Sequence, residues 1–361
     1  MTASQAANQR RIAETMTARP NVGVPAALPR PVGGTHASSS PLGRAIALIG
    51  VLAELTKARL VSLVVVTSAV GYLMASGPAW SLSRLLWTMA GTALAAAGSM
   101  ALNEWIEAER DGRMERTCRR PIPTGQISRP QALAVGVGIG ATGLGLLAWR
   151  TTPTSALLGL AVVLVYVLVY TPLKPRTPLC TLAGAVCGAL PPMMGWAAFD
   201  GSLGFGAWML AGVLFLWQIP HFLALAWLYR DDYARGGFRM LPVVDRGGRT
   251  TVHVVTLYTM ALLPVAIASS LAGLTGWVYA SGSLLLGAVL LAMGVVLARE
   301  RSAASARRLF LATLLYLPLL LGLMVADRTP RSTIRDARFS PHVDRHATML
   351  LDASLDGPDR P

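Results

Sequence analysis

Residues 103–125 read NEWIEAERDGRMERTCRRPIPTG, and this stretch sets the arrangement of the whole chain. It directly follows an apolar run of helical length and interleaves five acidic side chains with five arginines. Charged side chains at membrane depth are costly and are usually functional. We therefore expect this loop to lie at the edge of a membrane and to carry the chemistry of the protein.

The composition is that of a membrane protein. Of 361 residues, 53% are hydrophobic and only 14% are charged, and the mean hydropathy is +0.51, whereas a soluble domain carries about 25% charged residues. The net charge of +14 comes mainly from arginines scattered over many loops, which indicates membrane topology rather than nucleic-acid binding. The three cysteines show neither metal-binding spacing nor the pattern of a disulfide framework.

Nine apolar segments have the length of a transmembrane helix, which needs about 17 to 25 residues. The sequence therefore predicts an all-α membrane protein, a bundle of about nine transmembrane helices. The predicted spans are residues 60–76, 85–103, 131–149, 155–171, 178–198, 206–228, 251–272, 277–298 and 309–326.

Three parts are predicted along the chain. Residues 1–43 form a disordered basic N-terminal arm, residues 44–326 form the transmembrane domain, and residues 327–361 form a disordered C-terminal tail. Charged side chains interrupt the apolar pattern just before the first span, so residues 44–59 are interpreted as an interfacial lead-in.

The placement of lysine and arginine orients the bundle. With nine spans, the N-terminal arm and the loops at 103–130, 172–177 and 229–250 fall on one side, and the opposite loops between spans carry only Arg84 and Arg150. Basic loops stay in the cytoplasm. We therefore predict a multi-pass protein of the cell (inner or plasma) membrane, with the N-terminus and charged loops cytoplasmic and the C-terminus outside.

Asn103, Glu107 and Asp111 recur at every fourth position. On a helix they fall within a stripe about 80° wide and about 12 Å long. Carboxylate and amide oxygens suit Mg²⁺, which binds one or two carboxylates together with substrate phosphates. The stripe predicts such a site; the alternative is a solvated helix end with ion pairs such as Glu109–Arg113.

Arginines follow the stripe directly, at Arg116, Arg119 and Arg120. Guanidinium groups match phosphate oxygens in bidentate geometry. Carboxylates followed by arginines therefore favour a diphosphate whose oxygens are shared between a metal ion and the arginines. The remaining acids of the stretch lie off the stripe and are interpreted as solvated charges: Glu104, Glu109 and Glu115.

The loop after the fourth span carries Tyr170 and Lys174, again four residues apart. This pair is either a positively charged anchor with an interfacial tyrosine, or an anion-binding pair in which Tyr170 donates a hydrogen bond. The sixth span contains His221 and ends at Asp231 and Asp232. A histidine in an apolar span is either a hydrogen-bonded interior residue or a ligand or catalytic group.

These motifs resemble those of the UbiA superfamily of intramembrane prenyltransferases and, within it, the haem-farnesylating branch, the protoheme IX farnesyltransferases. The first block is N-x-W-x-E-x-x-x-D-x-x-M-x-R-T-x-x-R-P-I-P-x-G at 103–125. The second is Y-T-P-L-K with G-A-L-P-P-M-M-G-W at 170–196, and the third is W-Q-I-P-H-F with D-D-Y-x-x-x-G-x-x-M-L-P at 217–242. The similarity covers about residues 50–326.

The resemblance implies a nine-helix bundle around a central cavity. It implies transfer of a farnesyl group from farnesyl diphosphate to a vinyl group of haem B, which gives haem O on the route to haem A and the cytochrome oxidase cofactor. Haem B is then a substrate rather than a prosthetic group, and Mg²⁺ is the cofactor. The other implied partners are the lipid bilayer and the enzyme that next modifies the haem; no nucleic acid is implied.

Site residues also follow from the resemblance. The implied catalytic residues are Asn103, Glu107, Asp111 and Asp232, of which the three carboxylates hold the metal. The implied diphosphate-binding residues are Arg116, Arg120, Lys174 and Tyr170, and the acceptor-binding residue is His221.

Other functions remain open at this stage. The acceptor could be a quinone precursor, but Leu228 stands where the superfamily often has a second acid before Asp232, which favours the haem branch. An anion transporter would place its coupling acids near the bilayer midplane, whereas these acids lie at the ends of spans. A haem-binding assembly factor without catalysis would not need a magnesium site.

Overall fold

The computed structural model describes residues 40–329. Most of the predicted N-terminal arm and C-terminal tail lies outside the described residues. The helix α2 (Pro41–Leu55) crosses from a short N-terminal unit into the main unit, which begins at Ile49.

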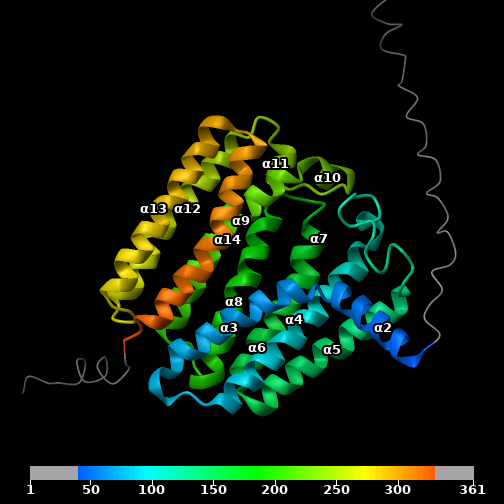
Figure 1. The fold of residues 1–361 in the computed structure, drawn as a ribbon, viewed down its shortest axis with the longest axis horizontal. Coiled ribbons are helices and arrows are strands. Elements are labelled where there is room, and N and C mark those ends of the chain that lie inside the picture. Colours follow the sequence, from blue (N-terminus) through cyan, green and yellow to red (C-terminus); the bar gives the residue numbers. More distant parts are fainter. Residues whose placement is uncertain (1–39, 330–361) are drawn as a thin grey trace, which may run out of the picture. The chain divides into compact units, whose positions relative to one another are not determined.

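Nine of the described helices are long and apolar enough to cross a membrane, as predicted (Figure 1). They are α3 (Ala58–Ser76), α4 (Leu82–Asp111), α5 (Arg129–Arg150), α6 (Pro153–Leu164) with its extension, α8 (Cys180–Asp200), α9 (Phe205–Leu228), α12 (Arg249–Leu271), α13 (Trp277–Glu300) and α14 (Ala303–Ala326). The short 3₁₀ turn η1 (Gly77–Ala79) ends the first span, the π-helix η2 (Val165–Tyr170) and α7 (Thr171–Leu173) extend α6, and α10 (Arg230–Arg235) and α11 (Leu241–Val244) follow α9.

Two ends differ from the sequence prediction. The helix α4 runs for 30 residues to Asp111 instead of ending near residue 103, so the whole polar stripe lies on it. A hydropathy pattern places the end of a span at its first charged side chain. The helix itself continues, because the charged side chains of its last turns find partners and the backbone hydrogen bonds persist. At the other end, residues 327–329 are not part of a free tail, because the amides of Gly276 and Tyr279 donate to Asp327 and the Thr329 amide donates to Leu274.

Small residues let α3 and α8 cross at very short range. A Cβ atom at Gly71 would collide with the carbonyl oxygen of Pro192, and one at Gly195 would collide with that of Ser68. Such close backbone approach is typical of helix pairs in membranes, where packing rather than the hydrophobic effect drives association. The helix α8 also packs on α9, which in turn contacts α12 and α14, so this crossing joins the earlier spans to the later ones.

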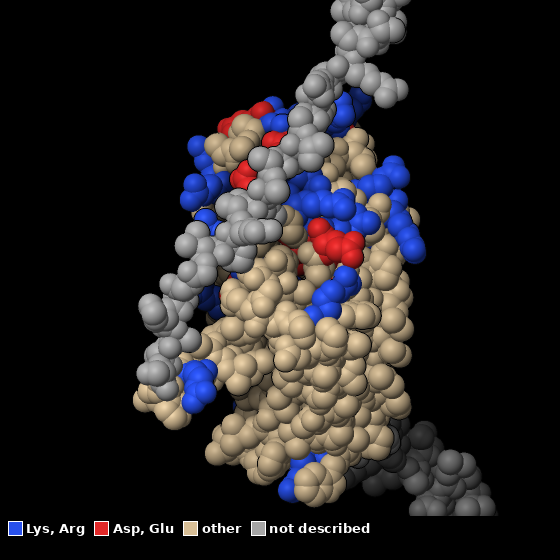
Figure 2. Space-filling model, turned by 90° about the vertical axis from the view of Figure 1, so that its right-hand side faces the viewer, with Lys and Arg blue, Asp and Glu red and all other residues tan. Residues whose placement is uncertain are grey.

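Most of the charged residues gather at the upper end of the face drawn in Figure 2, above a broad surface of other residues with a few basic side chains at its lower end. Large apolar side chains are exposed on the spans, among them Leu157, Leu285 and Leu315. In water such an apolar surface would promote aggregation, so we infer that these side chains face lipid. The loop after α4 lies at the same end as α10 and α11 in Figure 1, and a hydrogen bond from Arg110 to the Gly236 carbonyl joins them.

We predict that Gly195→Ala destabilises the bundle by about 1 to 3 kcal/mol, because overpacking forces the two backbones apart. Gly145→Ala on α5 is the matched control, since nothing lies within 4 Å of the added Cβ. Thermal unfolding in detergent measures the difference. Equal melting temperatures for the two variants would contradict the tight crossing.

Candidate active site

Each member of the predicted stripe is buried and paired with a different part of the chain. The Glu107 carboxylate forms an ion pair with Lys174, with Nζ–Oε distances of 2.8 and 3.0 Å. The Asp111 carboxylate accepts a hydrogen bond from Arg120 Nη1 at 2.6 Å. Charges at this depth are stable only when they are paired. The carboxylates of α4 are therefore paired with basic side chains from two different loops.

Asn103 links two further segments to α4. Its Oδ1 accepts a hydrogen bond from Lys57 Nζ at 2.8 Å, and its Nδ2 donates to Thr171 Oγ1 at 3.0 Å. Thr171 in turn donates to the Tyr166 carbonyl across the π-helical stretch η2. A π-helical turn adds one residue to a helix, and such turns are frequent at functional sites. Here it rotates the end of the fourth span so that Thr171 meets the stripe.

Lys174 is held over aromatic faces as well as beside a carboxylate. Its Nζ lies 4.6 Å from the ring centroid of Tyr170 and 5.8 Å from that of Phe238. Burial lowers the pKa of Lys174, but the charge and hydrogen bond of Glu107, together with Tyr166, outweigh burial, and the pKa lies above its ordinary value. Lys174 therefore keeps its charge, and Tyr170 contacts it through the ring face.

Glu104 is not a solvated charge, so that interpretation was wrong. Its side chain is 1% exposed, whereas Glu109 and Glu115 are 76% and 85% exposed, as expected. Its Oε1 lies 3.5 Å from Arg120 Nε and 4.0 Å from Lys57 Nζ. The position of Glu104 relative to the stripe did not reveal its burial, because the basic side chains that cover it, Lys57 and Arg120, come from other segments of the chain. Glu109 itself pairs with Arg129 at 3.0 Å rather than with Arg113.

Lys57 is a site residue that sequence reasoning missed by assigning it to an interfacial lead-in. It occupies the turn between α2 and α3 with a φ of +50°, in the left-handed region that side chains other than glycine rarely adopt. Burial and the neighbouring Arg120 lower its pKa to about 7, although Glu104 acts in the opposite direction. The sequence did contain one indication that Lys57 belongs to the site: a charged side chain between two apolar runs needs a partner.

Asp232 holds together two charged loops, the first at 103–130 and the second at 229–250. Its carboxylate accepts hydrogen bonds from the backbone amides of Glu115 and Arg116, at 2.8 and 3.4 Å, and from Arg235 Nη2 at 2.8 Å. Burial raises the pKa of Asp232, but the hydrogen bonds from Arg235 and the two amides outweigh it and hold the pKa below its ordinary value. The carboxylate therefore stays charged well into the acidic range.

The three predicted arginines differ in their surroundings. Arg120 turns inward to Asp111 and Glu104, whereas Arg116 and Arg119 are exposed. The Arg116 guanidinium lies over two rings at the start of the second charged loop, 5.5 Å from the centroid of Tyr229 and 5.8 Å from that of Tyr233.

Buried oxygens of the stripe fit a magnesium ion by chemistry. Asp111 Oδ1 accepts no hydrogen bond from the described residues, and neither does Glu107 Oε1, which meets only the Lys174 ammonium. Between positions 40 and 329, however, no group of three or more His, Cys, Asp or Glu side chains converges as metal ligands would. The structure thus does not bring Asp232 to the stripe, since two amides and Arg235 hold it on the neighbouring loop. A site shared by all three carboxylates stays a prediction.

His221 lies away from this charged cluster, in the interface between α9 and α14. Its ring is stacked between Trp217 and Phe310, and its Nδ1 is 2.9 Å from Thr313 Oγ1. The structure therefore shows a hydrogen-bonded histidine that is still partly exposed. Both interpretations of an intramembrane histidine remain compatible with this position.

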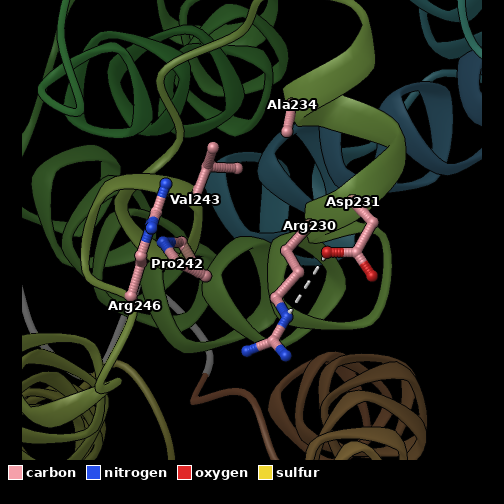
Figure 3. Close-up of a pocket in the computed structure, with 6 residues that line it drawn as sticks. All are labelled: Arg230, Asp231, Ala234, Pro242, Val243 and Arg246. Atoms are coloured by element: carbon pink, nitrogen blue, oxygen red, sulfur yellow. Dashed lines mark ion pairs between the residues drawn. The ribbon is translucent and has the colours of Figure 1, made fainter. Parts of the chain in front are cut away.

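A pocket of about 400 Å³ lies between α10 and α11, within the loop at 229–250 (Figure 3). Arg230 and Arg246 line it, together with Asp231, Ala234, Pro242 and Val243. Arg230 pairs with Asp231 at 3.7 Å, and both side chains are exposed. None of the stripe residues lines this pocket, so it is separate from the buried cluster.

The fold and the buried site define a class: a multi-pass membrane protein with a buried polar centre at one end of its spans. The model of the UbiA prenyltransferase family matches residues 64–317. The chain belongs to the UbiA prenyltransferase family.

Relatives and solved structures agree with this family. A protoheme IX farnesyltransferase of Solibacter usitatus is 43% identical over 284 residues, covering 76% of this chain and 97% of the relative. The mitochondrial protoheme IX farnesyltransferase of Homo sapiens is 38% identical, covering 78% of this chain and 63% of the relative. A UbiA homologue from Archaeoglobus fulgidus, solved with GPP and Mg²⁺, superposes with a TM-score of 0.58 at 14% identity, covering 76% of this chain and 99% of that one.

We predict that Asp232→Ala loosens the contact between the two charged loops. Hydrogen exchange at the amides of Glu115 and Arg116 should accelerate, because both lose their acceptor. In the unmodified protein, the protection of these two amides relative to their intrinsic exchange rates should fall on acidification. A lowered pKa means that the stabilising charge is present at neutral pH and is lost as the pH falls through the folded-state pKa. Asp231→Ala is the control, since Asp231 is 88% exposed. Unchanged exchange in Asp232→Ala would rule out this link.

Proposed function

We propose that this protein transfers a farnesyl group from farnesyl diphosphate to a vinyl group of haem B and so makes haem O. The observation that carries the reaction type is the set of buried cation–carboxylate pairs on α4, Glu107 with Lys174 and Asp111 with Arg120. The acceptor is proposed from the relatives named protoheme IX farnesyltransferase, which include bacterial and mitochondrial proteins.

The charged cluster suits a prenyl diphosphate because it offers both signs of charge at the membrane edge. Lys174 and Arg120 already carry charge and are directed at the stripe. Diphosphate oxygens can share these donors, and Arg116 and Tyr170 lie on the same loops to extend the binding surface. A UbiA homologue of the same fold was solved with GPP and Mg²⁺, which supports a prenyl diphosphate as the class of substrate. The farnesyl chain then extends between the apolar spans, where water is scarce.

The residues of this chain act by charge stabilisation. As the allylic C–O bond breaks, negative charge develops on the departing diphosphate, and Lys174, Arg116 and Arg120 stabilise it. When bound, Mg²⁺ supplies further neutralisation of that charge; Glu107 and Asp111 would hold it beside Asn103, with Asp232 on the adjoining loop. The haem vinyl group then bonds to the allylic cation, and a water molecule captures the resulting cation and loses a proton. No covalent enzyme intermediate is needed.

We further propose that the N-terminus and the charged loops face the cytoplasm and that the protein lies in the cell membrane. Basic loops at one end of the spans support this orientation. Farnesyl diphosphate is charged and therefore reaches the site from water rather than from lipid. In the proposed orientation the product is released at or within the bilayer, and the next haem-modifying enzyme binds it there.

We expect Asp111→Ala to decrease haem O formation by about 100-fold or more, because Arg120 loses the carboxylate that orients it and the proposed magnesium site loses a ligand. Membrane insertion should be unaffected. Glu109→Gln is the matched control, because this acid of the same helix is exposed. Mass analysis of haem extracted from cells with and without each variant measures the product. Undiminished haem O in cells producing Asp111→Ala would defeat the site assignment, whereas prenylation of a quinone precursor by the unmodified protein would defeat only the acceptor.

Farnesyl diphosphate binding should take up protons near neutral pH. Lys57 has a pKa of about 7 in the free protein, and an anion bound next to it raises that pKa, so a proton enters on binding at about pH 8. Calorimetry in two buffers of different ionisation enthalpy detects this uptake as a difference in heat. The difference should disappear in Lys57→Arg, which stays charged throughout. Equal heats for the unmodified protein in both buffers would contradict the prediction.

A further inference from the structure

The imidazole ring of His221 is fixed in its plane by two aromatic neighbours. The Trp217 ring lies 4.9 Å away at an interplanar angle of 20°, and the Phe310 ring lies 5.0 Å away at 26°. One neighbour is four residues earlier on α9 and the other is on α14, so the two helices hold the ring between them. Stacking fixes the plane of the imidazole ring but not its rotation within that plane, which a hydrogen bond must set.

Thr313 supplies that hydrogen bond and also decides its direction. Its hydroxyl lies 2.9 Å from His221 Nδ1 and donates to the Phe310 carbonyl at 2.6 Å. A hydroxyl has a single proton to donate. Because that proton is used on the carbonyl of its own helix, Thr313 Oγ1 can only accept from His221, and Nδ1 must carry the hydrogen. The neutral ring then has its lone pair on Nε2.

We propose that Thr313 is a positioning residue that fixes His221 as the Nδ1–H tautomer, so that Nε2 is presented as a ligand to the iron of the haem acceptor. This inference rests on the acceptor proposed above. A histidine that binds a metal usually donates its other ring N–H to an acceptor, which sets the tautomer and the ring orientation. The Trp217 indole donates to the Thr313 carbonyl at 2.9 Å and so ties the same turn of α14 to α9.

The tautomer can be measured without any substrate. Nitrogen NMR of the protein labelled with ¹⁵N-histidine distinguishes a protonated from an unprotonated ring nitrogen, and His221→Gln assigns the signal. We expect Nδ1–H in the unmodified protein and in Thr313→Ser, which keeps the hydroxyl. Thr313→Val, of nearly the same shape, should shift the ring toward Nε2–H. An Nε2–H tautomer in the unmodified protein, or no change in Thr313→Val, overturns the proposal.

The ligand role is tested by comparing haem B with metal-free protoporphyrin IX, which has the same vinyl groups but no iron. Loss of an outer partner of a metal ligand weakens metal binding by about tenfold or more. Thr313→Val should therefore bind haem B about tenfold more weakly, with Thr313→Ser close to the unmodified protein. Binding of the metal-free porphyrin should change by less than about twofold, since no bond to iron is involved. The control is Thr256→Val on α12, a part-buried threonine bonded to its own helix.

Equal weakening for both porphyrins in Thr313→Val would show a packing effect and overturn the ligand role. Unchanged binding of haem B would overturn it as well. Failure of the proposed function has a different signature. Cells producing the unmodified protein would then contain no haem O, while the tautomer measured by NMR would remain as found.

Discussion

The site depends on the burial of acidic and amide groups along one face of α4. An unpaired charge at this depth would destabilise the protein by several kcal/mol, about 3 to 5 when one partner of a buried pair is removed. Each stripe residue therefore requires a partner, and each partner comes from elsewhere in the sequence: Lys174 after the fourth span for Glu107, Arg120 from the adjoining loop for Asp111, and Lys57 before the first span for Asn103. The same contacts that assemble the cluster position the groups that we propose bind a diphosphate.

A second set of contacts keeps the two charged loops in register. Asp232 receives two backbone amides of the first loop, and Arg110 reaches back to the Gly236 carbonyl. In each bond a side chain of one loop meets a main-chain group of the other, so the contact depends on Asp232 and Arg110 and not on the side chains of Glu115 and Arg116. The acidic residue of the second loop has in this structure a clear architectural role in addition to the metal-binding role proposed for it.

In the proposed reaction the charged cluster and His221 contact different substrates. The cluster lies where the spans end and is proposed to bind the water-soluble part of farnesyl diphosphate. His221 lies within the apolar part of α9, against α14, where a flat and largely apolar acceptor is better solvated than in water. The close crossing of α3 and α8 stiffens the bundle, because tightly packed helix backbones cannot shift far relative to each other. This rigidity keeps the two sites at a fixed separation.

Much of this protein could be predicted from the sequence. The nine spans follow from hydropathy, since lipid requires long apolar helices, and the stripe at Asn103, Glu107 and Asp111 follows from helical period. The family followed from three motifs. The sequence did not show that Glu104 is buried, that Lys57 belongs to the site, or that Glu109 pairs with Arg129, because these depend on contacts between segments far apart in the chain.

The identity of the polar residues and their spacing along each helix were thus determined by the sequence alone, whereas their partners were decided by the tertiary structure. Local periodicity says which side chains share a face. Only the packing of the helices says what covers that face, and for a buried charge the covering group determines whether it is stable, how it titrates and what it can bind.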